Sequence, residues 1–197
     1  YKTWDAYDNQ GWPAEYLVDA SGRVRHEVSG EGDYPITESL IRRLLVAAHP
    51  GLHLPPPTSV PNLTPSLPQT PESYLGYDRL ENFAGSGIDP NQPAAYQFPS
   101  SLPPDELAFS GTWNVGSQEI TAGGDSRIEL SFSATDVYLV LGGTGTVGVS
   151  VNGVHTKTID VSGIPRLYTL VGGPGYQSSV LTLNVAKGIE AYDFTFG

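Results

Sequence analysis

The stretch from residue 127 to residue 153 constrains the fold more than any other part of the chain. Residues 128–133 alternate between apolar and polar, which is the period of a half-buried strand. Residues 137–141 are apolar throughout, as in a strand that is covered on both faces. Alternating valines then run into Asn152-Gly153, a pair that favours a two-residue hairpin because both turn positions need positive φ. The stretch therefore predicts three strands in the core of a β-sandwich.

Strand-like runs separated by turn signals continue to the C-terminus. Strands are predicted at residues 107–115, 119–122, 156–161, 167–171, 180–185 and 191–196. Turns are predicted at residues 123–125, 142–143, 162–163, 172–175 and 187–188. The run Gly142-Gly143-Thr144-Gly145-Thr146 lacks the lysine and helix of a phosphate-binding loop and is interpreted as a β-turn. About eight or nine strands in one domain predict a jelly roll over residues 72–197.

Residues 1–50 have the pattern of a β-hairpin followed by a helix. Trp12-Pro13 precedes the first strand, residues 19–22 are turn-like, and residues 23–28 form the returning strand. A helix is predicted from Pro35 to Ala48, with the apolar stripe Ile36, Leu40, Ile41, Leu44 and Leu45. A hairpin and one helix are too small to bury this stripe by themselves. We therefore expect the stripe to pack on the hairpin and also on another part of the protein or another chain.

Prolines crowd the segment between these two parts and predict a stiff linker over residues 51–71. The predicted organisation is thus an α/β segment at residues 1–50, the linker, and the jelly roll. The predicted fold class is mainly β.

Charge and residue usage exclude several classes of function. The formal net charge is -11, and nucleic acid and anionic membrane surfaces both need a basic patch. No apolar run is long enough to span a membrane. The chain has no Cys, which excludes disulfides, zinc-thiolate sites and a Cys nucleophile. It also has no Met, and Tyr1 would hinder removal of an initiator Met, so we expect a processed product or a fragment.

The order of the motifs resembles the C-terminal part of the DipZ-type disulfide-interchange proteins. The resemblance rests on residues 12–16 (WPAEY) and 30–34 (GEGDY), the Pro-rich linker, Asp136-Val137-Tyr138 and the glycine run at 142–146. Members of that family join a membrane-embedded reductant transporter to a thioredoxin-like domain and then to a jelly roll similar to carbohydrate-binding modules. The resemblance implies that residues 1–50 are the second half of a thioredoxin-like domain and that the chain is extracytoplasmic.

The same resemblance implies that Trp12-Pro13 is a cis-proline loop, for which a plain structural turn is the alternative. The family's redox centre is a Cys-x-x-Cys in the half of the domain that comes first. Because this chain has no Cys, it cannot form the mixed disulfide that such chemistry requires. The chain is therefore expected either to be a fragment or to have its missing half supplied elsewhere.

Two further sets of residues are candidates for ligand binding. A glycan site of aromatic and hydrogen-bonding side chains is predicted at Trp113, Arg166, Tyr168 and Tyr176. A structural Ca²⁺ site is predicted at Asp89, Asp105, Glu190 and Asp193, because Ca²⁺ takes carboxylate oxygens. The four histidines show no metal or triad spacing. Each aromatic residue has the alternative of simple core or edge packing, and no cofactor other than Ca²⁺ is expected.

Three functions remain open from the sequence. The first is a non-catalytic extracytoplasmic module that binds a glycan, neutral or basic because the chain is acidic. The second is a fragment of a thiol-disulfide oxidoreductase whose Cys-containing half is absent from this chain. The third is a secreted structural subunit that associates with copies of itself.

Overall fold

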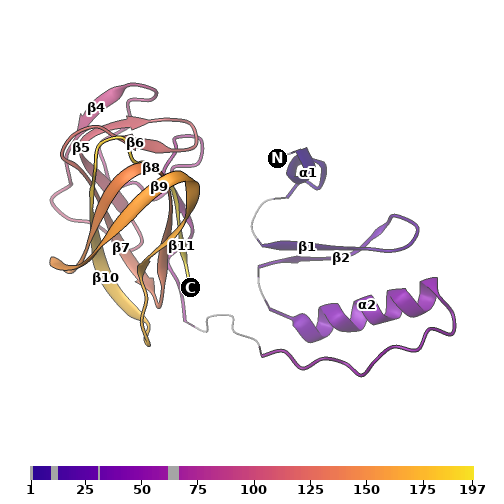
Figure 1. The fold of residues 1–197 in the computed structure, drawn as a ribbon. Helices are drawn as coiled ribbons and strands as arrows, with labels where there is room; N and C mark the ends of the chain where they lie inside the picture. Colours follow the sequence, from indigo (N-terminus) through magenta and orange to yellow (C-terminus); the bar gives the residue numbers. More distant parts are fainter. Residues whose placement is uncertain (1, 10–12, 31, 62–66) are drawn as a thin grey trace. The chain divides into compact units, whose positions relative to one another are not determined.

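The computed structural model describes residues 2–9, 13–30, 32–61 and 67–197 (Figure 1). The chain divides into two compact units, Tyr1–Ser66 and Leu67–Gly197. No helix in the described part of the chain is both long and apolar enough to cross a membrane.

The first unit contains the predicted hairpin and helix, preceded by a short helix. Its elements are α1 (Lys2–Ala6), β1 (Ala14–Val18), β2 (Val24–Ser29) and α2 (Tyr34–Ala48). The antiparallel hairpin turns at Asp19, whose carboxylate accepts hydrogen bonds from the backbone N–H of Ser21 and of Arg23. Asp33 is the N-cap of α2, but its side chain makes no capping hydrogen bond.

The apolar stripe of α2 is only partly covered within the described part of this unit. No residue of α2 is buried, and Ile36, Ile41 and Leu45 remain 53%, 39% and 39% exposed. This exposure agrees with the expectation that the hairpin alone cannot bury the stripe.

The first part of the predicted linker lies along α2 instead of extending freely (Figure 1). The Arg42 guanidinium donates to the carbonyl of Pro55 and, at 3.1 Å, to the Glu38 carboxylate. Thr58 donates to the same carboxylate from its backbone N–H at 3.0 Å and from its hydroxyl at 2.7 Å. These bonds lower the pKa of Glu38, chiefly through the Thr58 hydroxyl, and attach residues 55–58 to the helix.

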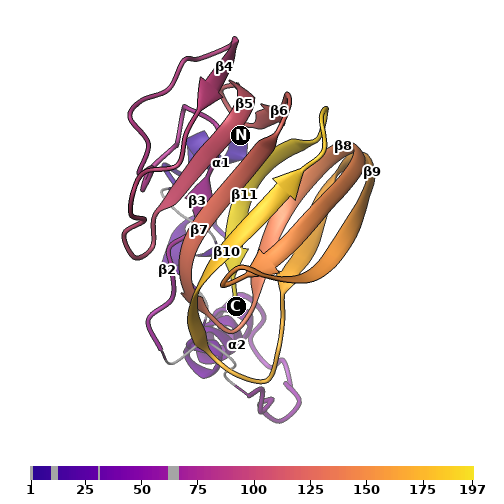
Figure 2. The same cartoon turned by 90° about the vertical axis from the view of Figure 1, so that its left-hand side faces the viewer.

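The second unit is a β-sandwich made from one sheet of nine strands, which confirms the predicted mainly β fold (Figure 2). Its strands are β3 (Ser73–Tyr74), β4 (Pro93–Tyr96), β5 (Leu107–Val115), β6 (Ile120–Ala122), β7 (Ser126–Ala134), β8 (Val137–Val151), β9 (Val154–Val171), β10 (Gln177–Val185) and β11 (Glu190–Phe196). Hydrogen-bonded neighbours in the sheet follow the order β3-β11-β6-β5-β7-β10-β8-β9, and β4 pairs with β5. The sheet closes on itself because β11 pairs with both β6 and β8.

One long strand joins the two layers of the sandwich. The first half of β8 pairs with β11, and its second half pairs with β10, so β8 belongs to both layers. The inward residues of the strands form one apolar core; its largest buried side chains include Trp113, Phe109, Phe132 and Phe194.

Two predicted turns are wrong, because they lie inside long strands. Residues 142–146 belong to β8, which has 15 residues, and residues 162–163 belong to β9, which has 18. Gly143 and Gly163 pair with each other at positive φ, next to a register shift between the strands. The predicted hairpin at Asn152-Gly153 is confirmed, with both residues at positive φ.

Candidate functional site

An open polar groove lies where the start of β7, the middle of β8 and the end of β10 come together. Its volume is about 670 Å³. It is lined by Gly124, Asp125, Ser126, Arg127, Thr146, Asn184, Val185, Ala186 and Lys187. Six of these residues have polar or charged side chains, so the groove offers hydrogen-bonding groups of several kinds.

Strand register places the polar groups beside one another. Arg127 and Asn184 are directly opposite on β7 and β10, and opposite residues of an antiparallel pair project from the same face. The turn after β10 is held against β8 by a hydrogen bond from the Ala186 N–H to the Thr146 carbonyl. Lys187 follows in this turn and also lines the groove.

The charged groups of the groove are not neutralised by one another. The Arg127 guanidinium lies 5.6 Å from the centre of the Phe98 ring, a distance at which the ring attracts the cation. Within the described residues, ion pairs form at Arg25 and Arg42 and none forms at Arg127, Lys187 or Asp125. The guanidinium and the ammonium therefore keep their hydrogen-bond donors available for a ligand.

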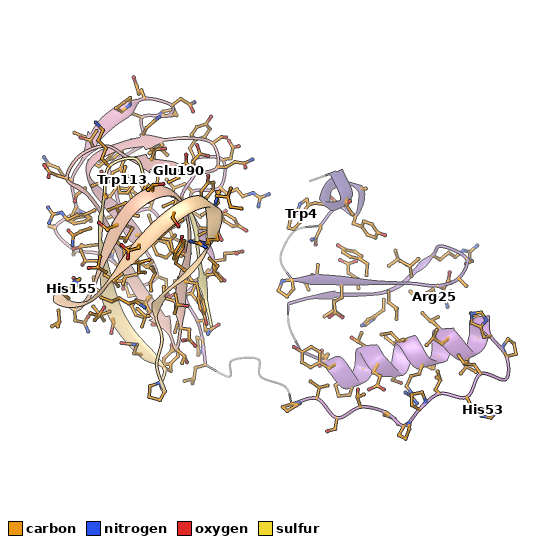
Figure 3. The ribbon with its side chains drawn as sticks, viewed as in Figure 1. Trp4, Arg25, His53, Trp113, His155 and Glu190 are labelled. Atoms are coloured by element: carbon orange, nitrogen blue, oxygen red, sulfur yellow. The ribbon has the colours of Figure 1, made fainter. Side chains whose placement is uncertain are left out.

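Trp113 does not belong to a ligand site, contrary to the prediction. Its side chain is fully buried between the layers, and its Nε1–H donates to the Ser110 carbonyl at 2.9 Å (Figure 3). Gly111 lies inside β5, as the predicted strand at 107–115 implies. The position that a Cβ would need at Gly111 is occupied by the Asp125 carbonyl, so the glycine serves close packing.

Arg166 and Tyr168 lie together on β9, as their spacing predicted. The Arg166 Nε donates to the Tyr168 hydroxyl at 2.8 Å, and this hydrogen bond is the main cause of the lowered Tyr168 pKa. A second guanidinium nitrogen donates to the Ser162 hydroxyl at 3.0 Å. The groups satisfy one another and leave fewer donors for a ligand than the groove does.

Tyr176 has a structural partner of its own. Its hydroxyl donates to the Pro68 carbonyl at 2.6 Å, so the loop after β9 holds the segment that enters the sandwich. The four predicted glycan-binding residues therefore do not form one site. Arg166 and Tyr168 bond each other, Trp113 is buried, and Tyr176 anchors the segment around Pro68.

The predicted Ca²⁺ ligands do not form a site. No group of three or more acidic or histidine side chains suited to a metal ion occurs among the described residues. Asp105 accepts a hydrogen bond from the Thr70 hydroxyl, and Glu190 accepts one from Tyr192 at 2.8 Å. The half-buried Asp193 has a pKa raised by burial and, secondarily, by Glu72. The exposed Asp89 interacts through its backbone N–H, which donates to the Tyr96 hydroxyl.

The predicted cis-proline loop is only partly within the described residues. Trp12 of the predicted cis-proline loop lies outside the described residues, while the Pro13 carbonyl accepts a hydrogen bond from the Gly30 N–H at 2.8 Å. His155 follows the hairpin turn between β8 and β9, and His53 lies in the segment after α2 (Figure 3).

The groove residues were not among the predicted ligands. Asp125 and Lys187 were included in the predicted turns, and Arg127 opened the first recognised strand. Their assembly depends on the register between β7 and β10, which no short-range signal in the sequence specifies.

Comparison with known proteins identifies the family. A family model described as "Thioredoxin like C-terminal domain" matches residues 70–197, which form nearly all of the second unit. The chain belongs to this family. The proteins named DipZ from Mycobacterium bovis and from Mycobacterium tuberculosis are each 42% identical to it over 200 residues. These matches cover 100% of this chain and 29% of each relative, and they confirm the predicted resemblance to DipZ-type proteins.

Two solved structures share weaker similarity. One is a family two carbohydrate esterase from Clostridium thermocellum in complex with cellohexaose, at 22% identity and a TM-score of 0.36; the match covers 40% of this chain and 26% of that one. The other is an active site mutant of a family two carbohydrate esterase from the same organism, at 21% identity and a TM-score of 0.41, covering 46% and 31%. At these TM-scores, neither match supports an inference about this chain.

Proposed function

We propose that the second unit is a non-catalytic module that binds carbohydrate in the polar groove. The supporting observation is the meeting of a guanidinium, an amide, a hydroxyl and a carboxylate at Arg127, Asn184, Thr146 and Asp125. Sugar hydroxyls both donate and accept hydrogen bonds, so a mixed set of donors and acceptors is complementary to them. Three of the four side chains project from strands or their ends, which gives the site a rigid frame.

A glycan array with matched variants tests this proposal. The unaltered chain is expected to retain at least one glycan class, and Arg127→Ala or Asn184→Ala should reduce retention by about tenfold. Arg166→Ala removes the same charge from β9 and is expected to leave retention unchanged. Loss of retention in Arg166→Ala alone would instead place the site at the Arg166–Tyr168 pair. Absence of retention on a broad array would refute carbohydrate binding.

We also propose that this chain is part of an extracytoplasmic region of a disulfide-interchange protein. The support is its similarity to proteins named DipZ, of which it spans about 29%, and the partly exposed apolar stripe of α2. In this proposal, the cysteines and the segment that covers α2 lie in another part of the longer protein. The stripe then packs against that segment.

Insulin reduction distinguishes the chain from the longer protein. This chain has no sulfur nucleophile and is expected to give the buffer rate. The full-length product of the same gene is expected to reduce insulin. Equal, background rates for both proteins would remove the support for a disulfide-interchange role.

Self-association has one observation in its favour. The strand β9 lies at an edge of the sheet and exposes 83% of Ile164 and 53% of Leu167. Pro165 stands between them without an N–H, which weakens strand pairing at this edge. Sedimentation of the chain as a monomer at high concentration would argue against this alternative.

A further inference from the structure

We infer that the glycan bound in the groove carries a single acidic sugar whose carboxylate is held by Arg127 and Lys187. This inference rests on the proposed carbohydrate-binding function and specifies the chemical class of the ligand. It differs from the expectation of a neutral or basic glycan, which followed from the net charge of the whole chain.

The distribution of cations within the second unit supports an anionic group. The unit contains five lysines and arginines: Arg79, Arg127, Lys157, Arg166 and Lys187. Two of the five line one groove, although the unit as a whole is acidic. At physiological ionic strength the Debye length is about 8 Å, so charges within the groove outweigh distant carboxylates.

The two cations differ in how they are held. The Phe98 ring beneath Arg127 restrains the guanidinium and leaves its edge free for two parallel hydrogen bonds to a carboxylate. Lys187 lies in a turn that is fixed to β8 and supplies a second, more mobile charge. Neither has an ion-pair partner in the part of the chain that the structure describes.

Neighbouring carboxylates limit the ligand to one such group. Asp125 lines the groove, Asp160 is directly opposite Thr146 on β9, and Glu129 follows Arg127 by two residues on the same face of β7. Further acidic groups on the ligand would approach these side chains and be repelled. A polyanionic glycan is therefore disfavoured, while one carboxylate between the two cations is favoured.

The remaining polar groups distinguish a sugar from a simple anion. Asn184, opposite Arg127, offers both a donor and an acceptor, and the Asp125 carboxylate accepts hydrogen bonds only. An inorganic anion has no hydroxyl to donate to either residue, whereas an acidic sugar has several. The groove therefore suits a carboxylate with hydroxyl groups on its ring.

Matched oligosaccharides test the inference on the whole 197-residue chain. Three probes share one backbone and carry no hexuronic acid, one, or one at every position, and calorimetry gives their affinities. The probe with one acid is expected to bind about tenfold tighter than the neutral probe, since a hydrogen bond to a charged group increases affinity by about this factor. The fully acidic probe should bind no tighter than the probe with one acid.

Charge-removing variants then assign the contact. Lys187→Gln should reduce the preference for the acid while changing affinity for the neutral probe by less than about twofold. Arg127→Gln should weaken binding of both probes, because Arg127 also contacts sugar hydroxyls in the proposed site, and should weaken binding of the acidic probe more. Lys157→Gln removes an equal charge outside the groove and should keep the preference. Because Lys187 is exposed in a turn, its variant is expected to fold even if Arg127→Gln does not.

The outcomes separate this inference from the proposed function. Equal binding of the neutral and singly acidic probes would overturn the inference and leave carbohydrate binding intact. Tighter binding of the fully acidic probe, or equally effective competition by inorganic phosphate, would also overturn it. If no probe or arrayed glycan binds, both proposals fail.

Discussion

Trp113 illustrates how one side chain can stabilise the sandwich while resembling a ligand-binding residue. Its indole is fully buried, lies 5.8 Å from the Phe109 ring centre and has its N–H bonded. Trp113→Ala should lower the free energy of unfolding by about 3–5 kcal/mol, because it opens a cavity in the core. Urea unfolding measures the loss, and Trp113→Phe should cost less. A variant that keeps its stability but loses glycan would restore the predicted ligand role.

Asp193 gives the sandwich a pH dependence whose direction follows from its raised pKa. The folded state holds the proton more tightly than the unfolded chain, whose pKa is about 3.9. The associated stability is therefore present below that pH and is lost as the pH rises through the folded-state pKa. Asp193→Asn should stabilise the protein at pH 7, because Asn removes the cost of the buried charge, and should stabilise it less at pH 3.

Urea midpoints at the two pH values test this dependence. Asp78→Asn, which removes an exposed carboxylate from the same unit, controls for the change in net charge. An equal gain from both variants at pH 7 would show that net charge, and not the burial of Asp193, is responsible.

Residue spacing predicted only those neighbours that share a strand. Arg166 and Tyr168 are two apart on β9 and do meet. Arg127 and Asn184 are far apart in the sequence and meet through strand register, so the sequence did not reveal them as a pair. The predicted strand at 107–115 was correct, but strand assignment alone did not show that Trp113 faces the core.

At the scale of elements, the alternation of apolar and polar residues predicted where the strands lie, whereas the glycines led to wrong predictions of where some strands end. The predicted strand at 107–115 matches β5, and the predicted helix at 35–48 matches α2 to within one residue. Glycines predict turns within β8 and β9, but there they allow close packing and irregular pairing. A Cβ at Gly143 would lie 2.6 Å from the Gly188 carbonyl, where the turn before β11 crosses β8.

Alanine substitutions at Gly143 and at Gly163 distinguish the stability lost through steric clash from the stability lost through backbone strain. Both glycines have positive φ, but a Cβ at Gly163 would meet no atom within 4 Å. Gly163→Ala should cost about 1 kcal/mol from backbone strain alone. Gly143→Ala should cost clearly more, since the Gly188 turn must also move. Thermal unfolding of the two variants measures the difference, and equal losses would contradict a packing role for Gly143.

At the scale of the whole molecule, both ends of the predicted linker are attached to folded units. The early part lies along α2, as described above for Thr58. The late part closes a free edge of β7: Thr70 donates its N–H to the Ser133 carbonyl, and its hydroxyl accepts from the Ser133 N–H. The proline content of residues 51–71 predicted a stiff linker, but it did not indicate which residues of the two units the linker forms hydrogen bonds with.

The attachment of Thr70 predicts where the sandwich can be separated from the rest of the chain. Residues 67–197 alone should unfold cooperatively, because this unit contains the core. Residues 71–197 lack Thr70 and the Pro68 carbonyl that Tyr176 bonds, so they should be less stable by about 1–3 kcal/mol. Thr70→Ala within residues 67–197 should cause only part of this loss of stability, since the backbone N–H of residue 70 still bonds the Ser133 carbonyl.

Calorimetry of these fragments, together with residues 1–66, also tests the first unit. Residues 1–66 are expected to show no cooperative transition, because no residue of α2 is buried within that unit. A cooperative transition for 1–66 would mean that the apolar stripe of α2 finds cover within its own unit. Equal stability of 67–197 and 71–197 would mean that the segment before the sandwich only connects it and does not close the edge of β7.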